Sequence, residues 1–358
     1  MTKSPTVYDV AAAAGVSTAT VSFTFRNPGR VKESTREAVL AAAKLLGYVP
    51  NASARSLARG RTGSLGLFAY DFMWNATDRR APAGQPLPAS HLLQGEPYDD
   101  FRLFPVYLDE VQRGFEMQCW RRGFELILGG RKDEFGENII NEIAGRVDGV
   151  AVFPRRLSAD TLAHVSRRIP VVEFAPGGDG GAYCHITADN ASGMGMIAGH
   201  LMTEHGMGDF VFVSSASNAD SEERRTAFNK VLEGSGLPLR DDLDHAPATI
   251  ARDLAELRDA GLFPQAFVCA SDLVALEVID ALTALGVSVP EDVAVTGFDG
   301  VVAGAVSTPG ITTIRQPMGD MGQLAADMLI ARSSGETTEN ESVVLPVRMI
   351  VRGSCGCA

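Results

Sequence analysis

Strand-like runs alternate with helical stretches along residues 63–358, and this alternation constrains the fold more than any other feature of the chain. Stretches of helical periodicity, such as 108–120 and 273–285, separate short runs that are rich in Val, Leu and Phe. This order predicts doubly wound parallel sheets, and about nine strands divide better into two sheets than into one. Such sheets bind ligands at the carboxyl ends of their strands, between two lobes. The predicted strands include 64–70, 124–130, 147–154, 169–175, 209–215, 265–271 and 292–299.

A chain of 358 residues is also too long for one ordinary domain. We predict a helical head over 1–50, a linker over 51–62 and an α/β core over 63–358. Within the core, lobe 1 is expected at about 63–175 and 303–335, and lobe 2 at about 176–302 and 336–358. The sequence contains no stretch of about 18 consecutive apolar residues, so no membrane span is predicted.

The head begins with the pattern of two helices joined by a tight turn. Thr6 and Asp9 fit a capping box that starts the first helix at Val7, Gly15 ends it, and Ser17 caps the second. Small and branched apolar residues on both helices can face one core. This is the helix-turn-helix pattern, in which the second helix enters the DNA major groove.

A third helix is expected to begin at a second capping box, formed by Ser34 and Glu37, and to end at Gly47. The predicted fold class is therefore an α-helical helix-turn-helix head plus a core of two doubly wound parallel-sheet lobes.

Charge is distributed unevenly between the head with its linker and the core. Residues 1–62 carry nine Lys and Arg against three Asp and Glu, a net charge of +6. The remaining residues carry 23 Lys and Arg against 41 Asp and Glu, or −18, and together the two parts give the net charge of −12. A basic head on an acidic core predicts that the head binds a polyanion, although a chance cluster of solvated charge is the alternative.

The linker has the composition of a short basic helix. Asn51 can cap a helix that ends near Ala58, and such a short helix forms only when it is docked on a partner. Leu57 is its one large apolar side chain, flanked by Arg55 and Arg59. An apolar side chain between arginines suits the DNA minor groove, whereas a basic linker with an incidental leucine is the alternative.

These segments resemble the lac-repressor (LacI/GalR) family of bacterial transcription factors over about 1–70 and 105–352. The resemblance rests on TVYDVAAAAGVSTATVS, on VKESTREAVLAAAKLLGYVPNASARSLARGRTGSLGL and on motifs of the core. It implies that Thr18 and Ala19 read bases and that Leu57 intercalates at the operator centre. Phe23 stands where the family commonly has an arginine, and Arg26 where asparagine is usual, so the operator sequence does not transfer. The predicted DNA-binding residues are Tyr8, Ser17, Thr18, Ala19, Thr20, Ser22, Phe23, Arg26, Arg30, Asn51, Ala54 and Leu57.

The resemblance also implies an effector site between the lobes of the core. Arg224 matches the family arginine that holds the effector, and Asp299, at a strand end, can accept hydrogen bonds from two hydroxyls. Ala175 and Pro176 stand where relatives often have an acidic residue followed by arginine, so one expected sugar ligand is missing. Asp272 is expected to be a helix N-cap. The predicted effector-binding residues are Tyr107, Arg224, Ser271, Asp299 and Gln316.

Residues 71–105 form an insertion that matches nothing in the family pattern. The segment is rich in Pro, Gly and Ala and carries several aromatic residues, including Phe72, Trp74 and Tyr98. Because it follows the first predicted strand of the core, it is either a lid over the effector site or a disordered insertion.

Other motifs in the sequence do not predict nucleotide binding or a metal site. Gly193, Gly195 and Ala198 match a dinucleotide fingerprint only formally, because no acidic strand end follows. His200 and His205 have the wrong spacing for sharing a helix face as metal ligands and are expected to be surface residues. Cys355 and Cys357 alone make a weak metal site, and the odd number of cysteines does not indicate a disulfide framework. We therefore predict no metal, no cofactor and no enzymatic activity.

The sequence predicts a cytoplasmic, homodimeric repressor that binds double-stranded DNA at a near-palindromic operator under the control of a small effector. The resemblance implies that the core is similar to a periplasmic binding protein and that the effector is a sugar or sugar derivative. The alternatives are a small-molecule-binding protein and a sugar- or nucleotide-processing enzyme. The N-terminus lacks the apolar segment of a secretory signal, which argues against a secreted binding protein.

Overall fold

The computed structural model describes residues 5–49, 61–69, 106–129, 136–153, 157–174, 182–214, 219–244 and 249–357. The chain divides into two compact units, Met1–Thr62 and Gly63–Ala358. The linker residues Asn51, Ala54 and Leu57 and the insertion 71–105 lie outside the described residues, as do Ala175 and Pro176. Among the described helices, none is long and apolar enough to cross a membrane.

The head is a three-helix unit with a small apolar core. Gly15, with φ of 64°, ends α1, and Ser17 caps α2, as predicted. Asp9 accepts hydrogen bonds from the backbone and hydroxyl of Thr6, both at 2.7 Å, which closes the predicted capping box. Val10, Val21 and Val39 are fully buried between the helices. The helices are α1 (Val7–Ala14), α2 (Thr18–Arg26), the 3-10 turn η1 (Pro28–Arg30) and α3 (Glu33–Leu46).

The second capping box, predicted at Ser34 and Glu37, is wrong. Helix α3 begins one residue earlier, at Glu33, and its N-cap is Lys32, whose side chain makes no capping hydrogen bond. Because the helix begins at Glu33, Ser34 lies within its first turn. Arg36 pairs with Glu33 at 3.1 Å across that turn.

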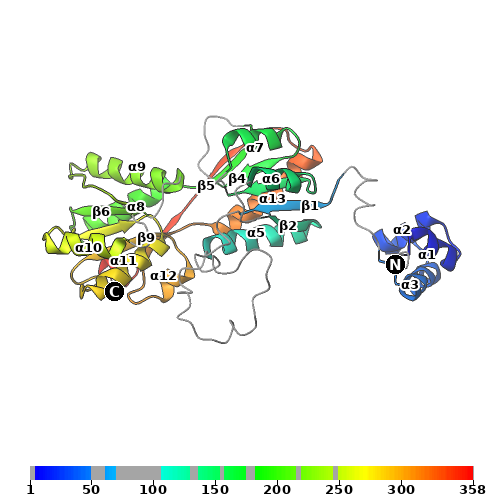
Figure 1. Ribbon diagram of the computed structural model, residues 1–358, viewed down its shortest axis with the longest axis horizontal. Helices are drawn as coiled ribbons and strands as arrows, with labels where there is room; N and C mark the ends of the chain where they lie inside the picture. The colour runs from blue at the N-terminus through cyan, green and yellow to red at the C-terminus, as the bar shows by residue number, and fades with distance from the viewer. Residues whose placement is uncertain are drawn as a thin grey trace. The chain divides into compact units, whose positions relative to one another are not determined.

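The core contains two six-stranded sheets, each covered by helices on both faces (Figure 1). Sheet A has the strand order β11-β5-β4-β3-β1-β2, and its paired strands are all parallel. Helices α5 and α13 pack on one of its faces, and α6 and α7 on the other. Its strands are β1 (Ser64–Phe68), β2 (Glu125–Gly129), β3 (Gly149–Val152), β4 (Val171–Glu173), β5 (Cys184–Ala188) and β11 (Ser342–Leu345); its helices are α5 (Val106–Arg122), α6 (Gly136–Ala144), α7 (Ala159–Ser166) and α13 (Met318–Ser334).

Sheet B has the order β12-β10-β9-β8-β6-β7, with β12 antiparallel to β10 and the other pairs parallel. Side chains alternate between its faces: Phe210 and Phe212 pack with α8 and α9, whereas Val211 and Val213 join the opposite core. Its strands are β6 (Phe210–Ser214), β7 (Leu243–Asp244), β8 (Ala266–Cys269), β9 (Ala294–Asp299), β10 (Thr312–Arg315) and β12 (Arg348–Ile350); its helices are α8 (Asn190–Thr203), α9 (Ala219–Gly234), α10 (Ile250–Asp259), α11 (Asp272–Ala284), α12 (Val302–Val306) and the 3-10 turn η5 (Gly353–Cys355).

The predicted lobe limits need correction. Strands β5 and β11, both assigned above to lobe 2, belong to sheet A, where β5 pairs with β4 and β11. Strand β10, assigned to lobe 1, pairs with β9 in sheet B. The chain therefore passes between lobes just after β5, just after β10, and between β11 and β12. Composition does not mark these passages, because apolar residues occur in the strands of both sheets.

Candidate functional sites

The first turn of α2 carries the residues predicted to contact DNA. The Ser17 hydroxyl accepts a hydrogen bond from the Thr20 backbone at 3.1 Å and lies 2.9 Å from the Thr20 hydroxyl. Thr18 is partly exposed and Ala19 is exposed, so neither is consumed by the core of the head. This end of α2 thus presents small polar side chains and one methyl group, which suit base edges in a major groove.

Phe23 and Arg26, the two departures from the family pattern, form a pair on the exposed side of α2. The Phe23 side chain is 40% exposed, and the Arg26 guanidinium lies 5.6 Å from its ring centroid. Arg26 also donates a hydrogen bond to the Ser22 carbonyl at 3.3 Å. The pair places a cation and an aromatic ring together on the exposed side of α2, with Arg26 in the last turn of the helix.

A surface hollow of about 550 Å³ joins α2 to the segment before α3. Its lining includes Ser17, Thr20 and Phe23 together with the cations Arg30 and Lys32. Tyr8, on α1, is 73% exposed. The structure thus brings four predicted DNA contacts, Ser17, Thr20, Phe23 and Arg30, to one concave surface of the head.

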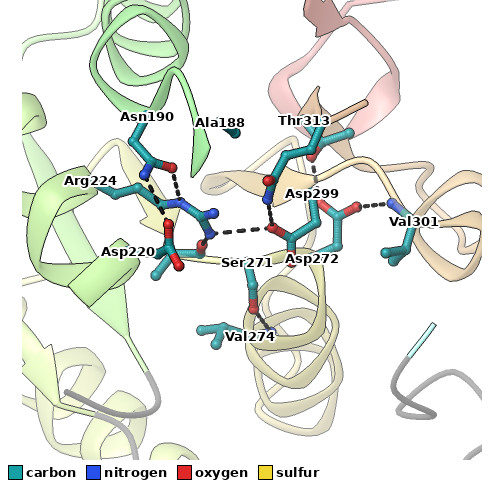
Figure 2. Close-up of polar contacts among 12 residues, drawn as sticks. Ala188, Asn190, Asp220, Arg224, Ser271, Asp272, Val274, Asp299, Val301 and Thr313 are labelled. Atoms are coloured by element: carbon teal, nitrogen blue, oxygen red, sulfur yellow. Dashed lines mark hydrogen bonds and ion pairs between the residues drawn. The ribbon is translucent and has the colours of Figure 1, made fainter. Parts of the chain in front are cut away.

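In the core, Arg224 of α9 lies at the centre of a buried polar cluster, defined as Asn190, Arg224, Asp299 and Gln316 (Figure 2). Its guanidinium donates to the Asn190 side chain at 2.8 Å, to the Ala270 carbonyl at 2.7 Å and to Asp299 at 3.2 Å. It also lies 3.8 Å from the centroid of the Phe298 ring, a cation–π contact. These contacts fix the guanidinium at the carboxyl ends of β8 and β9.

Asp299 ends β9 with φ of 102°, a conformation that is rare for residues other than glycine. Its Oδ1 accepts hydrogen bonds from Arg224 and, at 2.6 Å, from the Gln316 amide. Burial raises the pKa of Asp299 to about 6, although Arg224 and Gln316 oppose this rise. A buried carboxylate on a strained backbone is typical of a binding site.

Lobe 1 contributes an aromatic cluster, defined as Tyr107, Phe153 and Phe174. The Phe153 and Phe174 rings stack at 4.6 Å, and Tyr107 meets Phe153 edge-on at 6.2 Å. Phe153 and Phe174 directly follow β3 and β4, so they mark the carboxyl edge of sheet A. Burial raises the pKa of the Tyr107 hydroxyl above its usual range, and the charges of Asp220 and Asp299 raise it further. The Tyr107 hydroxyl is therefore close enough to the acidic residues of lobe 2 to sense their charge.

The prediction that Asp272 caps α11 is wrong, because Ser271 holds that position; an effector contact of Ser271 stays a prediction. Ser271 is the N-cap of α11, and its hydroxyl accepts a hydrogen bond from the Val274 backbone at 3.3 Å. Asp272 is fully buried and accepts hydrogen bonds from the Val301 backbone at 2.7 Å and the Thr313 hydroxyl at 2.5 Å (Figure 2). Burial raises its pKa to about 8, and Asp299 adds to this rise. Asp272 thus joins α11 to the ends of sheet B.

Several residues at these strand ends are not predicted from the sequence. Asn190 is buried and bridges Arg224 to Asp220 and Glu223, with distances of 3.0 and 2.6 Å to the two carboxylates. Arg315 pairs with Glu110 of α5 and so connects the two lobes. The position of Phe153 and Phe174 directly after strands was a usable signal; the partners of Asn190 and Arg315 are distant in sequence and gave none.

The two histidines are not separate surface residues as predicted. His200 and His205 are in contact, with ring centroids 5.0 Å apart, and both approach Cys355 and Cys357. Helix α8 ends at Thr203, so His205 lies beyond the helix and the rule about shared helix faces does not apply.

Comparison with known proteins agrees with both units. Residues 6–51 match the family of bacterial regulatory proteins of the lacI type, and residues 199–355 match a periplasmic binding protein-like domain. The chain is 30% identical to the HTH-type transcriptional repressor PurR of Erwinia tasmaniensis, over 98% of this chain and 96% of the relative. It is also 30% identical to the protein of the same name from Serratia proteamaculans, with the same coverage.

Solved structures share the fold. A structure of the lac repressor dimer bound to operator and the anti-inducer ONPF superposes with a TM-score of 0.78 at 22% identity, covering 99% of each chain. The transcriptional regulator CelR in complex with cellobiose superposes with a TM-score of 0.66 at 27% identity, covering 98% of this chain and 99% of that one.

A helix-turn-helix head joined to a two-lobed core defines a DNA-binding transcriptional repressor with a periplasmic-binding-protein-like domain. The chain belongs to the lacI family of bacterial regulatory proteins.

Proposed function

We propose that the protein is a homodimer that represses transcription at a near-palindromic operator and that a small hydroxylated molecule, a sugar or sugar derivative, controls its affinity for DNA. The effector binds between the polar cluster of lobe 2 and the aromatic cluster of lobe 1. Binding changes how the lobes are arranged, and this change alters the minor-groove contacts of the linker.

The observation that carries the effector proposal is the pairing of Arg224 with Asp299. Within the described residues, Nη2 of Arg224 and Oδ2 of Asp299 have no hydrogen-bond partner, while the other polar atoms of both groups are engaged. A donor next to an acceptor on rigid, buried side chains suits a hydroxyl group, which both accepts and donates. Two neighbouring hydroxyls would engage both residues.

The aromatic cluster supports a ligand with an apolar face. The stacked Phe153 and Phe174 rings contact planar or ring-shaped molecules well, and Tyr107 adds a neutral hydroxyl that can donate a hydrogen bond. A sugar ring has one apolar face and a hydroxylated rim, so it matches both clusters. A nucleobase also combines a flat face with a donor and an acceptor, and it is the ligand class to test against sugars.

The operator is tested by selecting random duplexes with the full-length protein across a salt series. We expect a near-palindromic consensus, because two heads related by a two-fold axis read two half-sites, and a steep loss of affinity with salt. Binding that shows neither a consensus nor salt dependence would contradict the proposal and favour a ligand-binding protein without a DNA target. Consumption of a ligand would instead favour an enzyme.

The effector site is tested with Arg224→Lys, which keeps the charge and removes the planar fork. A panel of sugars and nucleobases is screened on the wild type by thermal shift, and calorimetry then compares the variants with the best ligand. We expect a loss of at least about 10-fold in ligand affinity, with operator binding of the ligand-free protein unchanged.

Arg225→Lys is the matched control, because Arg225 lies on the same helix but pairs with Glu222 and Asp242 instead of the polar cluster. Equal ligand affinity in both variants would exclude Arg224 as a ligand contact. Stabilisation by nucleobases alone would replace the sugar with a base.

A further inference from the structure

Two histidines and two cysteines converge in lobe 2, away from the polar cluster. His200 lies near the end of α8, His205 follows that helix, and Cys355 and Cys357 lie at the end of the chain. One ligand atom from each of the four side chains lies within 4.8 Å of all the others. Among the described residues, this is the one such group of His, Cys, Asp and Glu.

Four of the six distances between the ligand atoms match the edges of a tetrahedron around one metal ion, and the other two are within 4.8 Å. With Zn–N bonds of about 2.05 Å and Zn–S bonds of about 2.3 Å, tetrahedral geometry requires about 3.3 Å between two nitrogens and about 3.5 Å between nitrogen and sulfur. The two Nε2 atoms are 3.3 Å apart. The nitrogen–sulfur distances are 3.4 Å for His200–Cys355, 3.6 Å for His200–Cys357 and 3.4 Å for His205–Cys357.

Two glycines with positive φ give the backbone the turns next to these four side chains. Gly356 has φ of 99°, in the left-handed region, which turns the chain between Cys355 and Cys357. A side chain at Gly356 would also meet the His205 ring, at 3.6 Å. On the other side of the cluster, Gly206 has φ of 63° and folds the chain back after α8, so that His205 reaches His200. Glycine is required for these turns because other residues rarely adopt positive φ.

A neighbouring hydroxyl lies within hydrogen-bond distance of one of the two cysteines. The Thr312 hydroxyl lies 3.1 Å from Sγ of Cys355 and 2.8 Å from the Arg352 carbonyl, and it can donate its one proton to either acceptor. Cys355 is 1% exposed, and Ser354 beside it is held by hydrogen bonds with the Thr312 and Val295 backbones. Outer contacts of this kind fix the orientation of a metal ligand and stabilise a thiolate.

From this geometry we propose that the protein binds one zinc ion through Nε2 of His200 and His205 and Sγ of Cys355 and Cys357. Two thiolates and two neutral imidazoles balance the charge of Zn²⁺, and a tetrahedral site of two nitrogens and two sulfurs is typical of zinc. Four protein ligands leave no position for a substrate, so the ion is structural. It joins the end of α8 to the C-terminal turn η5 and thereby holds the last residues of the chain on sheet B.

The first experiment measures metals in the untagged full-length protein, purified without chelator or added metal. We expect one zinc per chain by mass spectrometry. After zinc removal, titration with cobalt(II) alone should give the intense ligand-field bands of tetrahedral cobalt and thiolate-to-cobalt charge-transfer absorption. A protein that contains no zinc and gives no thiolate–cobalt absorption would overturn the proposal. So would an intact mass that shows Cys355 and Cys357 joined in a disulfide after purification under reducing conditions.

Variants then assign the ligands. Loss of an outer contact of a metal ligand typically lowers metal affinity by roughly 10- to 100-fold. His205→Ala and Cys357→Ser each remove a ligand itself and should lower zinc affinity by at least that much. His164→Ala is the matched control, because His164 is exposed on α7 and outside the cluster. If His205→Ala and Cys357→Ser impair folding, Cys357→His provides a second test, because it keeps four ligands. This variant should still bind cobalt in tetrahedral geometry, with weaker charge-transfer absorption because one thiolate is lost. Unchanged zinc affinity in both His205→Ala and Cys357→Ser would show that the ion binds elsewhere and would overturn the assignment.

Discussion

At the scale of single residues, the polar cluster combines groups that are costly to bury. Arg224 is 6% exposed and Asp299 is 9% exposed, and removing both from water costs several kcal/mol that their attraction only partly returns. Hydrophobic side chains of similar volume would fill this space with less strain. The cluster is therefore better explained by ligand recognition than by stability, and the rare backbone conformation of Asp299 agrees with this reading.

The raised pKa of Asp299 makes a prediction about stability and pH. Because the pKa rises from 3.8 in the unfolded chain to about 6 in the folded protein, the folded state binds more protons between these values. Stability from this residue is complete below about pH 4 and is lost as the pH rises through about 6. We expect the wild type to lose up to about 3 kcal/mol relative to Asp299→Asn over this interval, measured by urea unfolding.

Asp241→Asn is the control for this measurement, because Asp241 is an exposed acidic residue of the same lobe. If the difference between the wild type and Asp299→Asn did not change with pH, Asp299 would be ionised throughout the interval and the burial argument would be wrong.

At the scale of elements, glycines let two helices of lobe 1 approach backbone to backbone. Helix α13 crosses α5 where Gly322 faces the Val111 carbonyl and Gly114 faces the Gly319 carbonyl. A Cβ atom at Gly322 or Gly114 would overlap the facing carbonyl oxygen, so neither position has room for alanine. Since α13 follows a passage between the lobes, this crossing fixes the returning chain on sheet A.

Gly322→Ala should therefore destabilise the protein, by about 1–3 kcal/mol or more, because two helix backbones must separate. Gly319→Ala is a matched control on the same helix, where no neighbouring atom lies within 4 Å of an added Cβ. We expect that substitution to be neutral or to stabilise by up to about 1 kcal/mol. Thermal unfolding of both variants measures the difference, and equal midpoints would mean that the helices are not in close contact.

One glycine of α8 has a packing role as well. Gly193 lies within the helix, where a Cβ would press on the Phe298 ring at 2.7 Å, and Gly195 has open space. A dinucleotide fingerprint needs its first glycine in the turn between a strand and a helix. The formal match at Gly193 therefore reflects contact between α8 and sheet B, next to the ring that Arg224 covers.

At the scale of the whole molecule, the separation of charge assigns DNA binding to the head and linker. With a net charge of +6 in residues 1–62 and −18 in the rest, the core repels the DNA backbone while the head attracts it. The core is connected internally by three chain passages and by the Arg315–Glu110 pair, so a ligand that moves one lobe also acts on the connections.

The role proposed for Leu57 in the linker gives a prediction at this scale. Leu57→Ala should weaken binding to the selected operator by at least about 10-fold and leave binding to random duplex nearly unchanged, because an intercalating side chain acts only where a base step is opened. Arg59→Gln, which removes one charge, should weaken both kinds of binding and reduce the salt dependence. Titrations on both duplexes measure these losses. Equal losses for Leu57→Ala on the operator and on random duplex would exclude an intercalating role for Leu57.

The sequence alone determined the features that depend on neighbours along the chain. The limits of α1 and α2 follow from Thr6, Gly15 and Ser17, whose side chains or backbone act within one helical turn. The central strands β1, β3, β6, β8 and β9 are apolar runs that stand out without their partners. The family resemblance singles out Arg224, and a place at a strand end singles out Asp299, but neither signal predicts their mutual contact.

Only the tertiary structure decided features whose partners are distant in sequence. Edge strands β7, β11 and β12 are short, and they form because a neighbouring strand supplies their hydrogen bonds. The lobe limits depend on which sheet β5 and β10 join. His200 and Cys355 are separated by 155 positions and meet only after sheet B has closed. Local preferences fix where helices begin and strands run, but the contacts that build sites come from packing, which no short window of sequence contains.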